Sequence, residues 1–241
     1  MPDKPFHFKQ FSVKQDRCAM KVGTDGVLLG AWADVSHHPF SVLDIGAGTG
    51  VIALMTAQRC GAELIDAVEI DGAAYEQCVE NFENSPWNDR LFCYHASLAD
   101  FAGEMDDTYE LIVSNPPFFS EHTSSSDPGR EKARSAAWLP FEQLLEAVAR
   151  LLADDGRFNV VIPYREEERF LALAAGQRLY PYRITRVRGR EGAGEHGIGR
   201  SLVGLSFRER TLRTDMLAIE RERHDYTEAY RALTGDFYLN M

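Results

Sequence analysis

The fold is decided by the stretch Val42-Leu43-Asp44-Ile45-Gly46-Ala47-Gly48-Thr49-Gly50. An apolar strand pattern leads directly into a turn with three glycines, and a helical pattern follows from Val51 to Arg59. Gly46, Gly48 and Gly50 lack a side chain, so a ligand can lie against the bare backbone there. A strand, a glycine turn and a helix in this order predict an α/β fold with a ligand site at the carboxyl end of the first strand.

Acidic residues near the glycine turn indicate which kind of ligand it holds. Asp44 precedes the first glycine by two residues, where a carboxylate would repel a pyrophosphate and attract a cation. Val51 occupies the position where the dinucleotide fingerprint has its third glycine. The next apolar run ends in Glu69, which is placed to accept hydrogen bonds from ribose hydroxyls. S-adenosylmethionine carries a sulfonium, an ammonium and no phosphate, so it is the expected cofactor.

A second motif, Asn115-Pro116-Pro117-Phe118, closes the apolar run from Leu111 to Val113. The Asn115 side-chain oxygen and the Pro116 carbonyl are two acceptors that can hold both N–H bonds of a planar NH2 group. The two prolines stiffen the turn, and Phe118 offers a flat face for stacking. These four residues are the candidate catalytic set, for methylation of a weakly nucleophilic amine or amide nitrogen. The alternative is a rigid turn with a core phenylalanine.

Apolar strands alternate with helical patterns along most of the chain. This alternation predicts a parallel sheet with helices on both faces. The expected strands cover residues 6–13, 41–45, 64–69, 91–95, 109–114 and 157–162, and the expected helices cover 24–32, 50–60, 72–84, 140–153 and 165–175, with Thr24 as the cap of the first helix. After Arg178 the pattern is β-rich, at 180–188, 201–209 and 215–220, and predicts an antiparallel edge before a last helix at 226–234.

Composition excludes several classes of protein. The 241 residues are 44% hydrophobic and 26% charged, which is typical of a globular chain. The beginning has no apolar segment of a secretory signal, and no run approaches the length of a membrane span, so a cytoplasmic protein without membrane contact is expected. The four cysteines, Cys18, Cys60, Cys78 and Cys93, form no C-x-x-C pair and are expected to be reduced core residues, not metal ligands.

The net charge of −11 argues against a nucleic-acid partner, but the distribution of charge favours one. Between residues 178 and 213, nine arginines face only three glutamates. A local basic field is what steers a polyanion to a surface. The candidate RNA contacts are Arg183, Arg186 and Arg188, together with Arg134 in the polar segment 120–137, which could cover the acceptor. The alternative is a solvated face with no partner.

The two motifs above belong to a set of five sequence blocks that resemble one known family. They are Phe8-Lys9-Gln10-Phe11, the block from Cys18 to Trp32, the glycine turn, Asn115-Pro116-Pro117-Phe118, and the block from Leu233 to Leu239. Together they resemble the bacterial tRNA1(Val) adenine-N6 methyltransferases, which are class I S-adenosylmethionine-dependent enzymes. The resemblance spans the whole chain. It implies a Rossmann-like class I methyltransferase fold, with a mostly parallel doubly wound sheet and an antiparallel C-terminal edge.

The resemblance also implies a reaction and further site residues. The reaction is N6-methylation of the adenosine 3′ of the anticodon of a valine tRNA. Lys21, Thr24 and Gly26 are implied as cofactor contacts, and Ser97 stands where many class I enzymes place an Asp that binds the cofactor adenine. We expect an N-terminal strand and helix segment at 1–35 and a methyltransferase domain at 36–241, which form one globular unit.

Other acceptors are compatible with the same motifs. A guanine-N2 RNA methyltransferase, a protein glutamine methyltransferase and a DNA adenine methyltransferase all need to hold an NH2 or amide group. A cofactor-binding module without catalysis is the alternative from a different class. The basic C-terminal block favours a nucleic acid over a protein substrate.

Overall fold

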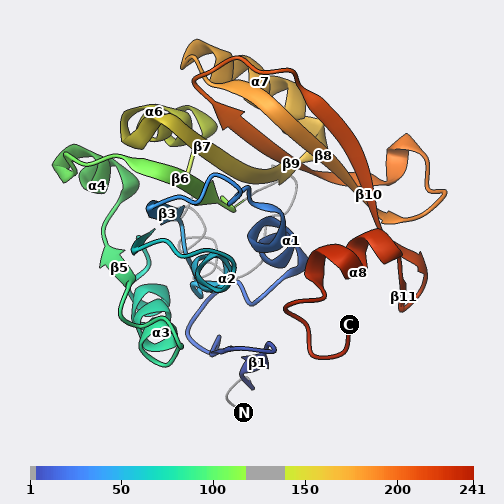
Figure 1. Ribbon diagram of the computed structural model, residues 1–241, viewed down its shortest axis with the longest axis horizontal. Coiled ribbons are helices and arrows are strands. Elements are labelled where there is room, and N and C mark those ends of the chain that lie inside the picture. Colours follow the sequence, from blue (N-terminus) through green and yellow to red (C-terminus); the bar gives the residue numbers. More distant parts are fainter. Residues whose placement is uncertain (1–3, 118–138) are drawn as a thin grey trace, which may run out of the picture.

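The computed structural model describes residues 4–117 and 139–241. Nine strands form its main sheet: β3 (Ser41–Ile45), β4 (Leu64–Glu69), β5 (Leu91–His95), β6 (Tyr109–Ser114), β7 (Leu152–Pro163), β8 (Tyr180–Arg190), β9 (Ile198–Ser206), β10 (Arg213–Glu222) and β11 (Asp225–Tyr226). Their order across the sheet is β11-β10-β8-β9-β7-β6-β3-β4-β5 (Figure 1). The five strands β3 to β7 pair with one another in parallel, which confirms the expected α/β architecture.

The C-terminal edge is mixed in direction. Strand β9 is antiparallel to both β7 and β8, as expected. Strand β11, which was not expected, is antiparallel to β10. Strand β10, however, runs parallel to β8, with Leu217 opposite Val187. Leu217 and Val187 are buried in the same core cluster, and the alternation pattern of each strand does not specify the direction in which the two strands pair.

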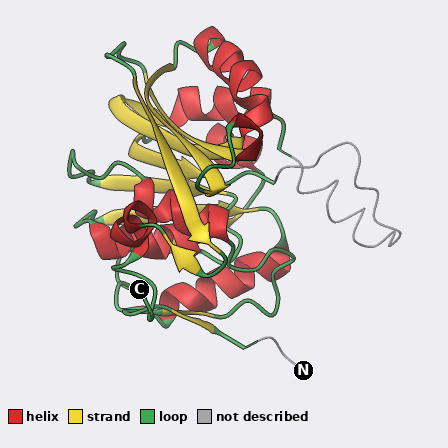
Figure 2. Cartoon of the chain, turned by 90° about the vertical axis from the view of Figure 1, so that its right-hand side faces the viewer, coloured by secondary structure: helices red, strands yellow, loops and turns green. Residues whose placement is uncertain are grey.

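Helices cover both faces of the sheet (Figure 2). The helices are α1 (Thr24–Trp32), α2 (Val51–Arg59), α3 (Gly72–Glu83), α4 (Leu98–Glu104), α6 (Phe141–Leu151), α7 (Glu167–Gly176) and α8 (Glu228–Thr234), with short 3-10 turns η1 (Tyr164–Glu166) and η2 (Glu195–Gly197). Successive residues of β6 point to opposite faces. Leu111 and Val113 therefore join the cluster that contains α1 and α2, whereas Ile112 joins the cluster of α6 and α7.

The expected single strand at 6–13 is wrong. Two short strands, β1 (Phe6–His7) and β2 (Ser12–Val13), pair antiparallel around a turn closed by a 2.8 Å bond from Phe8 N to Phe11 O. The rings of Phe8 and Phe11 stack at 4.6 Å, and Phe8 also stacks on Tyr238 from the C-terminal end of the chain. Folding back allows both phenylalanines to be buried against one core cluster, because a straight strand would leave one face in water.

Two features of the helices also differ from expectation. Gly23, and not Thr24, is the cap residue of α1, and no side chain accepts a bond there. Helix α4 was not expected at all, because seven residues are too few to show a clear period. Ser97 caps α4 by accepting a 3.1 Å bond from the backbone N–H of Asp100.

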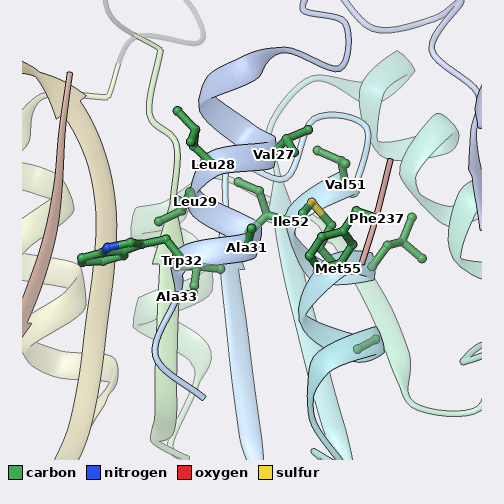
Figure 3. Close-up of a cluster of buried hydrophobic side chains, with 14 of the residues drawn as sticks. Val27, Leu28, Leu29, Ala31, Trp32, Ala33, Val51, Ile52, Met55 and Phe237 are labelled. Atoms are coloured by element: carbon green, nitrogen blue, oxygen red, sulfur yellow. The ribbon is translucent and has the colours of Figure 1, made fainter. Parts of the chain in front are cut away.

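Helices α1 and α2 pack closely because Gly30 has no side chain. A Cβ at Gly30 would lie 2.7 Å from Met55 Sδ and 2.9 Å from Met55 Cβ. Figure 3 shows Met55, Ile52 and Ala31 between the two helices, and Trp32 extending from the end of α1. The Trp32 indole donates a 2.8 Å bond to the Thr185 hydroxyl on β8, which fixes α1 across the sheet.

We predict that Gly30→Ala lowers the free energy of unfolding by about 1–3 kcal/mol, because the added methyl group overpacks the contact with Met55. Helix propensity alone would favour alanine by about 1 kcal/mol. Gly103→Ala in α4 is the control, since nothing lies within 4 Å of its added Cβ, and it should be neutral or stabilising. Urea unfolding measures both, and a stabilised Gly30→Ala protein would contradict the packing argument.

Candidate active site

The glycine turn lies where β3 ends and α2 begins. Its three glycines have positive φ angles, +73° at Gly46, +55° at Gly48 and +77° at Gly50, a region that L side chains rarely adopt. Nothing within 4 Å would meet a Cβ at Gly46 or Gly48, so this backbone is open to a ligand. Gly50 serves packing, because a Cβ there would lie 2.6 Å from Phe82 Cε1 on α3.

Glu69 ties the glycine turn to the end of β4. Its Oε2 accepts a 2.8 Å bond from Gly48 N, and its Oε1 accepts a 2.9 Å bond from Asp71 N. The residue is only 8% exposed. Each carboxylate oxygen has capacity for a second bond, so Glu69 fits the expected role of accepting from ribose hydroxyls.

Asp44 is a fully buried carboxyl beneath the turn. Its Oδ2 accepts a 3.1 Å bond from Ala53 N, while Oδ1 is buried without a hydrogen-bond partner among the described residues. Burial raises the pKa of Asp44 to about 7, and the nearby charge of Glu69 acts in the same direction. An unpartnered buried oxygen beside an open turn fits a cationic group of a bound ligand, so the donor set fits S-adenosylmethionine.

Asn115 follows the last residue of β6 and lies beside α1. A Cβ at Gly26 would lie 3.9 Å from Asn115 Nδ2 and 3.4 Å from Val51 Cγ1. The N-terminal block, the helix after the glycine turn and the Asn-Pro-Pro motif therefore meet at one point. Pro116 is buried, and Pro117 is half-buried.

An ion pair that the sequence analysis missed holds this end of α1. Arg200 Nε on β9 donates a 2.7 Å bond to Asp25 Oδ2, next to Gly26. Asp25 could have been noticed from its place in the N-terminal block. Arg200 gave no signal, because the two residues are 175 positions apart. Lys21 and Thr24, the other cofactor contacts implied by the resemblance, are exposed just before and at the start of α1.

Ser97 has a structural role in the observed geometry. Its hydroxyl accepts from Asp100 N at 3.1 Å and donates to Asp100 Oδ2 at 2.6 Å, at the start of α4. Its contact with the cofactor adenine stays a prediction. Phe118 and Arg134 lie outside the described residues, as does the whole segment 120–137.

The three candidate RNA arginines of β8 do not form one patch. Alternate residues of a strand point to opposite faces. Arg183 lies on the α1 face, where its guanidinium carbon is 4.4 Å from the centre of the Trp32 ring. Arg186 lies on the α7 face and is paired with Glu167. Arg188 is half-buried, and its Nε has no partner within the described part of the chain.

Among the described helices, none has the length and apolar character needed to cross a bilayer. In residues 4–117 and 139–241, no three His, Cys, Asp or Glu side chains are grouped so that they could hold a metal ion.

We predict that Asp44→Asn flattens the pH dependence of stability in the absence of cofactor. The pKa of Asp44 is about 7 in the folded chain and about 4 when unfolded, so the folded state binds more protons between these values and loses stability as pH rises. The free energy of unfolding of the wild type, relative to Asp44→Asn, should fall by about 2–3 kcal/mol from pH 5 to pH 7.5.

Urea unfolding at each pH checks this, with Asp89→Asn as a control that removes one exposed negative charge. Parallel stability profiles for the wild type and Asp44→Asn would show that the buried carboxyl does not titrate in this range.

Comparison with known proteins identifies the family of this chain. The methyltransferase small domain model matches residues 27–172. A tRNA1(Val) (adenine(37)-N6)-methyltransferase of Flavobacterium johnsoniae is 57% identical over 237 residues, covering 98% of this chain and 100% of that protein. A protein of the same name from Pectobacterium carotovorum is 45% identical over 237 residues, covering 98% of this chain and 94% of the relative.

A solved structure shows the same fold. The predicted O-methyltransferase Atu636 of Agrobacterium tumefaciens superimposes with a TM-score of 0.69 at 20% identity, covering 88% of this chain and 96% of that one. The expectations of a Rossmann-like methyltransferase fold and of an S-adenosylmethionine-dependent enzyme are confirmed at the level of the family. On the sequence identities and coverage above, the chain belongs to the family of the tRNA1(Val) (adenine(37)-N6)-methyltransferases.

Proposed function

We propose that this chain transfers a methyl group from S-adenosylmethionine to N6 of adenosine 37 in tRNA1(Val). The names of the relatives support this substrate. The main observation in support of the methyl transfer is the position of Asn115. It follows the carboxyl end of β6 and lies near Gly26, and β6 is the neighbour of β3, the strand that leads into the glycine turn. As a tRNA-modifying enzyme, the protein would work in the cytoplasm.

The residues at this point can hold an exocyclic amine. Asn115 Oδ1 and the Pro116 carbonyl each accept one N–H bond, and Pro116 has no N–H of its own to compete. Oδ1 is the acceptor of the Asn115 amide and Nδ2 its donor, so the amine would bind at Oδ1. Two such bonds favour a pyramidal nitrogen, which frees its lone pair from the adenine ring as the transition state requires.

The residues around the glycine turn position the methyl donor. Glu69 would hold the ribose, while the unpartnered Oδ1 of Asp44 would face positive charge. When bound, S-adenosylmethionine supplies a methyl group on a positively charged sulfur. The chain needs no strong base, because the nitrogen becomes acidic once it is alkylated. Positioning is the main contribution of these residues, and in model reactions it is worth about 10^5 M or more in effective molarity.

The direct test uses tRNA from cells that lack this gene. The protein is incubated with labelled S-adenosylmethionine and bulk tRNA, and the labelled nucleoside is identified by digestion. We expect N6-methyladenosine, in valine tRNA only. Labelled N2-methylguanosine, or labelling of a release-factor glutamine instead of tRNA, would reject the proposal.

We predict that Glu69→Ala raises the Kd for S-adenosylhomocysteine about 10–150-fold, which is the range for a lost hydrogen bond to a charged group. The control is Glu104→Ala at the exposed end of α4, and its affinity should match the wild type. Calorimetry measures both values. Unchanged affinity in Glu69→Ala would remove this carboxylate from the cofactor site.

We predict that Asn115→Ala lowers kcat on tRNA by far more than tenfold and leaves the Kd for S-adenosylhomocysteine nearly intact, because Asn115 serves the methyl acceptor. Single-turnover kinetics and calorimetry give the two numbers. A variant that kept more than about a tenth of kcat, a barrier change of only about 1.4 kcal/mol, would show that the amide is not needed for the reaction.

A further inference from the structure

The carboxyl edge of the sheet separates a cofactor side from an acceptor side. Along the order of the strands, Glu69 follows β4, the glycine turn follows β3, Asn115 follows β6, and Tyr164 follows β7. Strands β6 and β7 pair directly, with Ser114 opposite Val160. Asn115 is therefore level with Val161. Tyr164 lies three residues, about 10 Å, further along the neighbouring strand and about 4.8 Å to the side, away from the cofactor residues.

Tyr164 is held in a fixed orientation by groups from two other elements, β8 and η2. The guanidinium carbon of Arg186 lies 5.4 Å from the centre of its ring. Its hydroxyl donates a 2.8 Å bond to Glu195 Oε1 in η2. The ring is half-buried, so part of it stays accessible.

Arg186 is itself fixed by a buried carboxylate. Glu167 Oε1 accepts a 2.6 Å bond from Arg186 Nη2 and a 3.2 Å bond from Nε. Glu167 is 6% exposed and also accepts from the Ser201 hydroxyl. A bidentate pair of this kind sets the plane of the guanidinium and balances its charge. Arg186 is therefore poorly suited to neutralise a phosphate but well suited to support a flat ring.

We propose that Tyr164, supported by Arg186 and Glu167, is a stacking site for the base next to the target adenosine. This inference rests on the proposed function and names a part of the substrate that it contacts. Bases of a single-stranded loop are recognised by stacking on aromatic side chains and guanidinium planes. When the target base is held at Asn115, the next nucleotide of an extended single-stranded loop can reach Tyr164, which lies beyond Asn115 at the end of the neighbouring strand β7.

The test measures binding of unmodified valine tRNA transcript at saturating S-adenosylhomocysteine over a series of salt concentrations. Tyr164→Ala should weaken tRNA binding about 5–150-fold, the range for one base stacked on an aromatic ring, while Tyr164→Phe keeps most of the affinity. The slope of log affinity against log salt should not change, because stacking releases no counterions. Tyr75→Ala is the matched control, since Tyr75 stacks on His95 on the cofactor side, at 5.2 Å.

A second experiment identifies the base. Anticodon stem-loops carry an abasic site immediately 5′ or 3′ of the target adenosine, and each is bound to wild type and to Tyr164→Ala. The loss caused by Tyr164→Ala should disappear with one of the two abasic loops. Its persistence with both would overturn the inference, as would wild-type affinity of Tyr164→Ala for the intact tRNA.

Other outcomes reject the inference in distinct ways. A flatter salt slope in Tyr164→Ala would indicate a phosphate contact, and equal losses in Tyr164→Phe and Tyr164→Ala would trace the effect to the hydroxyl and Glu195. Thermal unfolding and S-adenosylhomocysteine affinity report whether each variant is folded. A wild-type protein that does not methylate tRNA would reject the proposed function itself, whereas methylation with unchanged Tyr164→Ala binding rejects only the stacking site.

Discussion

The hydrogen bonds of the Glu69 carboxylate hold together the part of the molecule on which the site depends. By accepting from Gly48 N and Asp71 N, Glu69 fixes the glycine turn after β3 relative to the loop after β4. The turn needs positive φ angles at Gly46, Gly48 and Gly50, and it then directs α2 back along the sheet. The position of α2 in turn sets that of α1, because Gly30 allows α1 to pack directly on Met55.

The buried carboxyl group of Asp44 near this turn lowers the stability of the free protein and favours binding of a cationic ligand. Asp44 has no exposed surface, and one of its oxygens has no hydrogen-bond partner among the described residues, so its ionised form is costly in the free protein. A cation bound beside it would remove part of this cost, which links affinity for the cofactor to the raised pKa of Asp44. The free protein is thus destabilised by the buried Asp44 carboxylate, and cofactor binding would reduce this destabilisation.

The arginines show why charge counts along a chain do not locate a binding surface. Arg183 lies against Trp32, Arg186 is neutralised by Glu167, and Arg200 holds Asp25 beside the Asn115 loop. Each of these three side chains makes a contact with another residue of the protein. Each therefore has a partner within the protein, and a role of these arginines in RNA binding stays a prediction.

Local sequence patterns encode the alternating strands and helices, and they place Asp44, Glu69 and Asn115 at the carboxyl ends of three strands that are neighbours in the sheet. Their order along the chain and the shared edge of parallel strands were enough to bring them together. Tertiary contacts determine the presence of the Phe8–Phe11 turn, the direction of β10, and the ion-pair partners of Arg186 and Arg200. Those features depend on burial and pairing between residues far apart in the chain, such as Asp25 and Arg200, and no local period carries that information.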